Sequence, residues 1–509
     1  MVASRILDSL SPVTMVALGL FLLLMVGMLN LLWDRKKNVF NLPGPMPLPF
    51  LGNALKFLGP PEAIVETIAK ITKTYGPGPV RVHLGSRPNV LIYEPEGFQK
   101  ILSSSKQITK GTDYKMMWPW LGTGLGMSTG EKWHARRRMI TPAFHFKILE
   151  SFIDVMNDQC LILCDNVLAP LPVALANGKE VDVCPIVAHA TLDILCETAM
   201  GRSINAQQCS DTGYQRAIND ATELVVERQR SPWIWDNWAF GLSLTGYRMR
   251  KVLKIIHGFS EKVISERKVE LVTELGAEEG GGQKRRRAFL DHLLEMSQGS
   301  NGLSDMDIRE EVDTLMSGGF NSTATNISFT LWLLATHPEV QARCHRELDS
   351  IFGDSSREAT NEDLAAMKYL DCCLKESLRL YPSAPMISRT LSEEVEIDGK
   401  TIPAQTDVFL LIFVLHRDPT CFPDPDRFDP DRFSLDNQQK LQDYSYVPFS
   451  AGLRNCIGQK FVKMEQKLLI SSVLRNYTLK SSMTVEEIPL VFTLFLQPKH
   501  GLRVAFTRR

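Results

Sequence analysis

The pattern of hydrophobic and polar positions sets the start of the chain apart from the rest. Residues 13–33 carry no charged side chain and are mostly Leu, Val and Met. This is about the 20 residues that a helix needs to cross the hydrocarbon core of a membrane. Arg35, Lys36 and Lys37 follow after Asp34, whereas Arg5 is the one basic residue before the stretch. Because positive charge stays on the cytosolic side, the pattern predicts a single-pass anchor at residues 1–33 with the rest of the chain in the cytosol.

Two other interpretations of this apolar stretch exist. A cleaved signal peptide has a shorter apolar region that ends in a cleavage site of small residues. A buried core helix is disfavoured because the stretch is uniformly apolar and a basic cluster follows it.

Prolines dominate the next segment, residues 34–52. Four of them, Pro43, Pro45, Pro47 and Pro49, fix the backbone φ angle and remove amide donors. The segment is therefore predicted to be a basic and Pro-rich hinge between the membrane and the body of the protein.

The remaining residues, 53–509, carry the alternation of patterns typical of a folded domain. Strand-like stretches at 80–84 and 90–93 come first, and helical periodicity then dominates from about residue 95 to 380. Short strands and turns return after residue 385. We expect one mainly α domain with a small β subdomain.

One helix of this domain is predicted to be unusually long. Ser304 and Asp307 have the spacing of an N-terminal capping box, and the apolar pattern continues from there to His337 and Pro338. A helix of that length is expected to cross the whole domain.

Composition narrows the class of function. The chain has 509 residues, 44% of them hydrophobic, and a formal net charge of -1, so it lacks the basic excess typical of nucleic-acid binding. Its ten cysteines are scattered and none form a Cys-x-x-Cys pair. This pattern predicts reduced thiols in the cytosol and no structural zinc site.

The most specific chemical signal surrounds one cysteine near the C-terminus. It lies in the segment Phe449-Ser450-Ala451-Gly452-Leu453-Arg454-Asn455-Cys456-Ile457-Gly458, which a helical pattern follows. The glycines allow sharp turns and close approach to a flat ligand. A thiolate at a helix start and near an arginine is stabilised by the local positive potential. A buried structural cysteine is the alternative, but the pattern Phe-x-x-Gly-x-Arg-x-Cys-x-Gly is complete.

This segment resembles the haem-binding loop of the cytochrome P-450 superfamily. Two more elements follow in the family's order, since Glu376-Ser377-Leu378-Arg379 resembles its Glu-x-x-Arg helix and Pro430-Asp431-Arg432-Phe433 its Pro-x-Arg-Phe element. The resemblance implies the cytochrome P-450 fold after the anchor, with Cys456 as the axial thiolate ligand of the iron of haem b. Glu376, Arg379 and Arg432 are expected to pair in a structural role behind the haem.

The same resemblance implies further haem-binding residues. Trp133-His134-Ala135-Arg136-Arg137 resembles the family's Trp-x-x-x-Arg helix, in which Trp133 and Arg137 share one face and bind a haem propionate. Arg389 and Arg454 resemble two more propionate partners, and Phe449, which opens the cysteine loop, is expected at the haem as well.

The long helix departs from the family at the catalytic pair. Gly318-Gly319-Phe320-Asn321-Ser322-Thr323 stands where the family has two small residues, an acid and an alcohol that carry protons to the oxygen-binding side of the haem. Asn321 replaces the acid and cannot titrate, although it can orient a water molecule. Ser322 replaces threonine and keeps the hydroxyl, while Thr323 is expected to point elsewhere.

Other stretches resemble the fatty-acid ω-hydroxylase branch, family four. These are residues 119–126, 138–146 and 311–316. In many members of that branch a glutamate of the long helix forms an ester with a haem methyl group, and Gly318 stands at that position here. We therefore expect non-covalent haem.

The pocket walls that the resemblance implies are apolar. They comprise residues 114–121, Leu315, Phe320, Met386, Ile387 and residues 492–495, which suits a fatty acid, another lipid or a hydrophobic xenobiotic. The tryptophan-rich stretch 232–238 is expected either to enter the membrane surface or to pack in the core.

The expected function is that of a haem-thiolate monooxygenase of the endoplasmic reticulum membrane. Electrons are expected from an NADPH-dependent P-450 reductase, with a cytochrome b-type protein as a further donor, because the chain shows no flavin or dinucleotide motif. Docking is expected on a basic face made of Arg136, Arg138, Lys460, Lys463 and Lys467. Two alternatives are an isomerase or dehydratase of lipid peroxides that needs no reductase, and a non-catalytic binder of haem or lipid.

Overall fold

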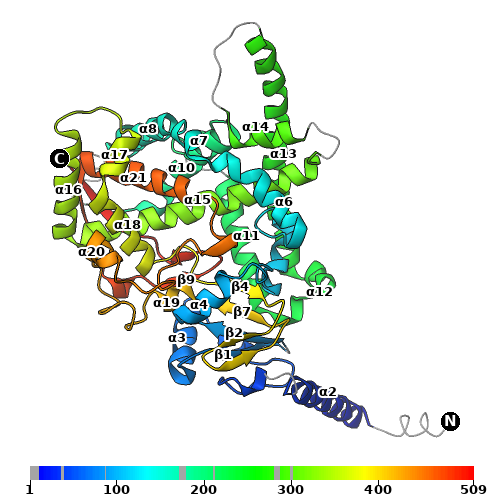
Figure 1. Cartoon of the computed structure of the whole chain (residues 1–509). Helices are drawn as coiled ribbons and strands as arrows, with labels where there is room; N and C mark the ends of the chain where they lie inside the picture. Colours follow the sequence, from blue (N-terminus) through cyan, green and yellow to red (C-terminus); the bar gives the residue numbers. More distant parts are fainter. Residues whose placement is uncertain are drawn as a thin grey trace.

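The computed structural model describes residues 11–35, 39–85, 87–170, 179–209, 213–279, 287–297 and 302–509. Figure 1 shows a mainly helical body with a small region of strands beneath it, from which the N-terminal helix projects. The α-helices are α2 (Pro12–Arg35), α3 (Ala63–Tyr75), α4 (Pro95–Leu102), α5 (Trp118–Leu121), α6 (Gly130–Ile140), α7 (Phe146–Glu150), α8 (Ile153–Leu161), α10 (Val183–Leu195), α11 (Gly213–Arg230), α12 (Asn237–Leu242), α13 (Leu244–Glu279), α14 (Phe289–Met296), α15 (Asp305–Thr336), α16 (Pro338–Phe352), α17 (Asn361–Ala366), α18 (Lys368–Leu380), α19 (Ile412–Leu415), α20 (Leu435–Gln438) and α21 (Gln459–Asn476).

The strands form small sheets. They are β1 (Val80–Leu84), β2 (Arg87–Ile92), β3 (Val181–Asp182), β4 (Ile387–Thr390), β5 (Val395–Ile397), β6 (Lys400–Ile402), β7 (Asp407–Leu410), β8 (Tyr477–Lys480), β9 (Leu490–Phe492), β10 (Leu496–Pro498) and β11 (Arg503–Arg508). The largest sheet has the order β1-β2-β7-β4, in which β2 and β7 run parallel and the other pairs antiparallel. The register sets Arg389 of β4 opposite Val408 of β7, and the predicted mixture of helices with a small β part is confirmed.

Helix α15 runs through the helical body and confirms the predicted long helix. The Ser304 hydroxyl accepts a hydrogen bond from the Asp307 amide at 3.2 Å, and the Asp307 carboxylate accepts one from the Ser304 amide at 3.1 Å. The helix ends at Thr336 because Pro338 begins α16. Its 32 residues span about 48 Å. It packs against α10, α13, α18 and α21, so most of its side chains are buried, whereas Gly318 is exposed.

A buried ion pair joins α18 to the loops that precede the cysteine segment. Arg379 donates to both carboxylate oxygens of Glu376 at 2.7 and 2.8 Å, and both side chains are completely buried. Arg379 also donates to the carbonyls of His416, Pro425 and Arg427, and Arg432 lies 3.4 Å from Glu376. These contacts confirm the predicted triad. Removing one partner of such a buried pair typically costs about 3–5 kcal/mol, so the triad fixes this region rigidly.

The first helix is exposed along most of its length. Val13, Phe21 and Leu24 of α2 are exposed by 77%, 60% and 54%, which is unusual for apolar side chains. Val13–Leu29 is the apolar part of this helix whose surroundings the structure describes. The basic residues Lys36 and Lys37 lie outside the described residues.

A second apolar stretch belongs to the core. Within the described part of the chain, Val183–Met200 is the one helical stretch that is long and apolar enough to cross a membrane, and 72% of it is buried in the protein. It consists of α10 and the π-helical turn Cys196–Met200, and α10 packs along α15. Packing against α15 explains its apolarity.

The Pro-rich segment is in contact with the body. The carbonyl of Pro43 accepts a hydrogen bond from the Arg81 amide of β1 at 2.8 Å, and Leu42 is buried. A Cβ on Gly44 would lie 2.1 Å from the Arg81 carbonyl oxygen, so only glycine allows this approach. The described part of the expected hinge is thus held on β1 and does not stand free of it.

Candidate functional site

The cysteine loop is shaped by two local constraints. The Cys456 amide donates to the Phe449 carbonyl at 2.9 Å, which closes the loop just before α21 begins at Gln459. Gly452 has a φ of +66°, and a Cβ there would lie 1.8 Å from the Leu102 carbonyl oxygen of α4. The loop therefore reaches its position only with glycine at 452.

The Cys456 thiol lies in a buried setting and faces a cavity. Burial raises its pKa, whereas the Gly458 backbone, Arg137 and the Gln459 backbone lower it. The helix start and an arginine therefore act on the thiol as expected, but burial outweighs them, and the arginine is Arg137. Although Cys456 is exposed, it lines two internal cavities, so that its surface opens inward. A metal that binds the thiolate must displace the proton.

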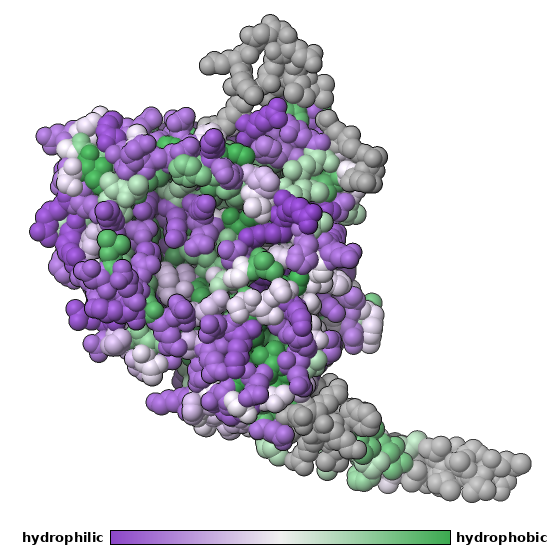
Figure 2. Space-filling model, in the orientation of Figure 1, coloured by the Kyte–Doolittle hydropathy of each residue, from purple (hydrophilic) through white to green (hydrophobic). Residues whose placement is uncertain are grey.

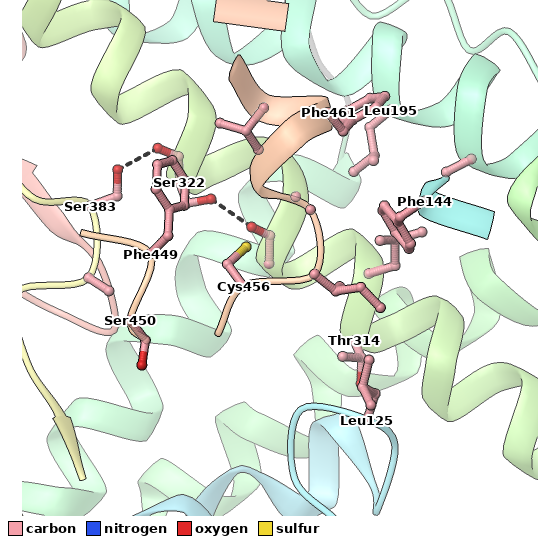
Figure 3. Close-up of a pocket in the computed structure, with 18 of the residues that line it drawn as sticks. Leu125, Phe144, Leu195, Thr314, Ser322, Ser383, Phe449, Ser450, Cys456 and Phe461 are labelled. Carbon is pink, nitrogen blue, oxygen red and sulfur yellow. Dashed lines mark hydrogen bonds between the residues drawn. The ribbon is translucent and has the colours of Figure 1, made fainter. Parts of the chain in front are cut away.

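The two cavities meet at Cys456 and at α15. The smaller has a volume of about 330 Å³ and the larger about 510 Å³, and Gly318 and Thr314 line both. Figure 3 shows Cys456 inside the smaller cavity, with Ser322 and Ser383 on one side and Phe144 and Leu195 on the other.

The adjacent glycines of α15 serve different purposes. A Cβ on Gly319 would lie 2.7 Å from the Leu195 side chain of α10, so Gly319 permits the close packing of these two helices. A Cβ on Gly318 would meet no atom within 4 Å. Gly318 therefore leaves open space beside the helix, on the side that faces Cys456.

Arg454 lines the smaller cavity and is held there by main-chain carbonyls. Its guanidinium donates to the carbonyls of Ile108, Leu125 and Ser128 at 3.0, 3.2 and 2.6 Å. It also lies 4.7 Å from the centre of the Trp133 ring, close enough for a cation–π contact. Burial, with Arg389 nearby, lowers the pKa of Arg454 to about 9.

Lys110 and Arg389 extend this group of cations. The two residues form an isolated β-bridge, which sets Lys110 beside β4. Burial lowers the pKa of Lys110, and the charges of Arg389 and Arg454 lower it further. Burial also lowers the pKa of Arg389, although Tyr114 and Asp113 oppose this. Asp113 offers little compensation, since burial raises its own pKa to about 6.

The chemistry of this group matches a ligand with two carboxylates. Among the described residues no ion pair with Asp or Glu joins Lys110, Arg389 or Arg454. Cations that repel one another in a buried wall need external negative charge. Cys456 and Gly318 line both cavities, Arg454 lines the smaller and Lys110 the larger, whereas Arg389 lines neither and is paired to Lys110. The residues present therefore fit haem: Cys456 would hold its iron, and Lys110 and Arg454 would bind its propionates, with Arg389 beside Lys110.

The structure brings most of the predicted haem residues together. On α6, Trp133 is buried beneath Arg454, and Arg137 donates to the Asn455 carbonyl at 2.9 Å and to its side chain at 2.7 Å. Phe449 lines the smaller cavity together with Cys456. Lys110 was not predicted, because no local motif marks it and only its pairing with Arg389 places it in this wall.

Of the predicted catalytic pair, Ser322 lines a cavity and Asn321 does not. The Asn321 amide donates to the Asn219 side chain of α11 at 3.1 Å, and Asn321 is buried and lines neither cavity. The Ser322 hydroxyl lines the smaller cavity and donates to the Gly318 carbonyl at 2.6 Å. Thr323 donates to the Gly319 carbonyl, away from both cavities, as expected.

Most of the predicted pocket wall is confirmed. Tyr114, Trp120, Leu121, Met386, Ile387 and residues 492–495 line the larger cavity, and Leu315 lines the smaller. The prediction that Phe320 forms part of the pocket wall is wrong, since this residue is completely buried in the core and lines neither cavity.

The prediction that Arg136 belongs to an exposed basic face is also wrong. Arg136 is buried and forms ion pairs with Asp307 and Glu311 of α15, so it cannot meet a partner protein. Lys467 is engaged by Asp371 and the Leu364 carbonyl. Arg138 and Lys460 remain exposed.

Comparison with known proteins identifies the class. The sequence profile of the family described as Cytochrome P-450 matches residues 42–506. The chain belongs to this family of haem-thiolate monooxygenases and is an oxidoreductase that uses haem with a thiolate ligand.

The relatives place it near family four. The chain is 42% identical to Cytochrome P-450 4c3 of Drosophila melanogaster over 520 residues, covering 99% of this chain and 96% of the relative. It is 42% identical to Cytochrome P-450 4V2 of Homo sapiens over 468 residues, covering 91% and 88%. It is 43% identical to Cytochrome P-450 4d2 of Drosophila melanogaster over 472 residues, covering 90% and 93%. The predicted family and branch are confirmed.

The placement of Lys110 predicts a contribution to haem retention. We expect Lys110→Met to speed haem loss about 10-fold or more, because a charge-assisted hydrogen bond contributes about 1.5–3 kcal/mol. Transfer of haem to excess apomyoglobin measures the rate. Lys106→Met is the control, since Lys106 pairs with Glu393 at the surface. Equal rates for both variants would show that Lys110 does not hold the haem.

Proposed function

We propose that this chain inserts one oxygen atom from dioxygen into a hydrophobic substrate, with electrons from an NADPH-dependent P-450 reductase. The observation that carries the substrate class is the larger cavity, which joins Cys456 to the outer part of the fold at Trp235. Its wall is mainly apolar and aromatic, including Phe57, Ile68, Trp120 and Phe409. When bound, haem supplies the chemistry that activates dioxygen.

The wall supports a lipid or fatty acid better than a polar metabolite. Apolar pockets bind mainly by removing hydrocarbon from water and orient their ligand with few polar groups. Arg87 and Arg230 line the larger cavity together with Trp235, and Arg87 lies 5.2 Å from the centre of the Trp235 ring. A long apolar chain could therefore reach Cys456 while its polar end stays near these arginines.

The cavity end at Trp235 supports entry from a membrane. The two segments that contribute Phe57 and Trp235 to the cavity wall also carry exposed apolar side chains, namely Met46, Leu48, Phe50, Leu55, Leu58, Trp233, Trp238, Leu242 and Leu244, here called the outer apolar patch. The Phe50 ring contacts Gly27 of α2, and Arg230 donates to the Phe57 carbonyl at 2.9 Å, so α2 and the patch are joined. Figure 2 shows the apolar surface of α2 projecting from a mostly polar body.

Membrane attachment in the endoplasmic reticulum, with the body in the cytosol, is part of the proposal. The full chain is expected to stay with microsomal vesicles in alkaline carbonate, because about 20 apolar residues span the hydrocarbon core. A variant without residues 1–35 is expected to be extracted, while retaining weaker binding through the outer apolar patch. Trp233→Ser with Trp238→Ser in that variant should abolish the remaining binding. Release of the full chain by carbonate would refute the anchor.

The central test combines a spectrum with turnover. Reduced, carbon-monoxide-bound protein is expected to show the red-shifted Soret band of thiolate ligation, and Cys456→Ser should lose it. With dodecanoic acid as the probe substrate, product should require NADPH, reductase and dioxygen together. Turnover of a lipid hydroperoxide without reductase would favour the isomerase alternative. Bound haem with no product from a broad lipid panel would favour a non-catalytic binder.

Haem is proposed to be non-covalent. Gly318 stands at the position of the ester-forming glutamate and has no side chain to supply a carboxylate. Acid denaturation followed by mass spectrometry should release free haem from the natural chain. In Gly318→Glu, part of the haem should remain on the polypeptide, since open space surrounds that position. Haem that stays attached to the natural chain would contradict the proposal.

A further inference from the structure

The site lacks a titratable acid at the usual place on α15. Asn321 is turned to Asn219, and the Ser322 hydroxyl donates to a main-chain carbonyl. The proposed reaction nevertheless consumes two protons, since substrate, dioxygen, two electrons and two protons give the hydroxylated product and one water. Another group must supply these protons.

One carboxyl group lines the smaller cavity, among the residues that the structure describes. It belongs to Glu311, two turns before Gly318 on α15. Glu311, Thr314, Leu315, Gly318 and Ser322 all line this cavity, at the spacing of a single helix face. Glu311 is exposed by only 2%, and both of its carboxylate oxygens accept from the Leu125 amide, at 3.1 and 2.9 Å.

The next turn supplies a hydroxyl group. The Thr314 hydroxyl is buried, has no hydrogen-bond partner among the described residues, and lines both cavities. Beyond it, Gly318 leaves open space beside the helix. A buried hydroxyl without a partner and open space beside it are suited to hold water molecules. They lie between Glu311 and the part of the cavity above Cys456.

On its other side Glu311 is connected to solvent. Arg136 of α6 lies 3.7 Å from the Glu311 carboxylate and also pairs with Asp307, and Lys132 lies 3.6 Å from Asp307. The Lys132 and Asp307 side chains are exposed by 42% and 26%. This ion cluster leads from the surface to the buried carboxyl group.

We propose that Glu311 is the proton donor of the site, passing protons through the Thr314 hydroxyl and water at Gly318, and regaining them from solvent through water along the ion cluster, whose Arg136 stays protonated throughout. Each transfer moves one proton from Glu311 and leaves a carboxylate, which solvent protonates again before the second transfer. The inference rests on the proposed monooxygenase reaction, in which the reductase supplies the two electrons.

Electrostatics around Glu311 agree with this role. Burial raises the pKa of Glu311 to about 7. The Leu125 amide, Arg136 and Lys132 lower it, and the neighbouring Glu310 raises it. The group can therefore both hold and release a proton near neutral pH. Because it donates in its protonated form, proton supply should decline as pH rises through about 7.

The first test follows the proton itself and requires no turnover. In infrared spectra of the full, haem-loaded chain, a carbonyl band of a protonated carboxyl group should disappear as pH rises through about 7. Glu311→Gln should lack this band while keeping an acceptor for the Leu125 amide. Glu310→Gln is the matched control and should keep the band, because Glu310 does not line the cavity and accepts from Thr123. No band specific to Glu311 would overturn the proposal.

The second test uses the complete system with reductase and dodecanoic acid. Glu311→Gln should slow NADPH oxidation about 10-fold or more, enlarge the solvent deuterium isotope effect and remove the decline above neutral pH. The first electron transfer, trapped with carbon monoxide, should not change. Thr314→Val should act in the same direction and Thr314→Ser should restore turnover, which keeps the test decisive if Glu311→Gln folds poorly.

The outcomes separate this inference from the proposed function. A titrating band with unchanged NADPH oxidation and isotope effect in both Glu311→Gln and Thr314→Val would overturn the relay and leave the monooxygenase intact. A natural chain that yields no oxygenated product would count against the proposed function, whereas the infrared band would still report on Glu311.

Discussion

The site depends on the cost of holding charge away from water. A thiolate and two carboxylates of haem can be buried together only if cations are buried with them. The cations that this chain would supply to haem are Lys110, Arg137, Arg389 and Arg454, from the segment before α5, from α6, from β4 and from the cysteine loop. Without those negative partners the cations are disfavoured, since burial lowers the pKa of Lys110 and of Arg454 and the charge of neighbouring arginines lowers both further. Haem and the protein wall therefore stabilise each other.

The scaffold behind the cysteine loop meets a related constraint in a different way. Glu376 and Arg379 neutralise each other completely within the protein, and three main-chain carbonyls occupy the remaining donors of Arg379. This pair needs no ligand, so it can hold the loops around α18 before haem binds. Lys110, Arg389 and Arg454, in contrast, need a negatively charged ligand. The two sets thus divide the roles of scaffold and binding site.

Local signals made much of the fold and site predictable. The ends of α15 followed from Ser304, Asp307 and Pro338, since a capping box and a proline act within one turn. The cysteine loop was recognisable because Gly452 is demanded by one close backbone contact. Each of these constraints depends on a few residues that are close together in the sequence.

Features that depend on distant contacts could not be predicted in this way. Lys110 joins the haem wall through pairing with β4, far along the chain. Arg136 looked like a surface cation next to Arg137 and Arg138, but the face of α6 on which it lies is covered by α15. Phe320 likewise faces the core because of the rotation of α15 relative to its neighbours. Helix periodicity gives the relative directions of side chains, and only packing decides which direction is inside.

The placement of charge along α15 follows from the same electrostatic constraint. At residue 321 the neighbour is Asn219 of α11, and a neutral amide can donate to the Asn219 side chain without burying a charge. At residue 311 the Leu125 amide and Arg136 compensate a carboxyl group, so an acid is tolerated there although it is equally buried. A buried acid costs less where donors and a cation are already in place. On this helix Leu125 and Arg136 meet that condition at residue 311, so an acid is kept beside the cavity, whereas residue 321 faces Asn219 away from both cavities and carries a neutral amide.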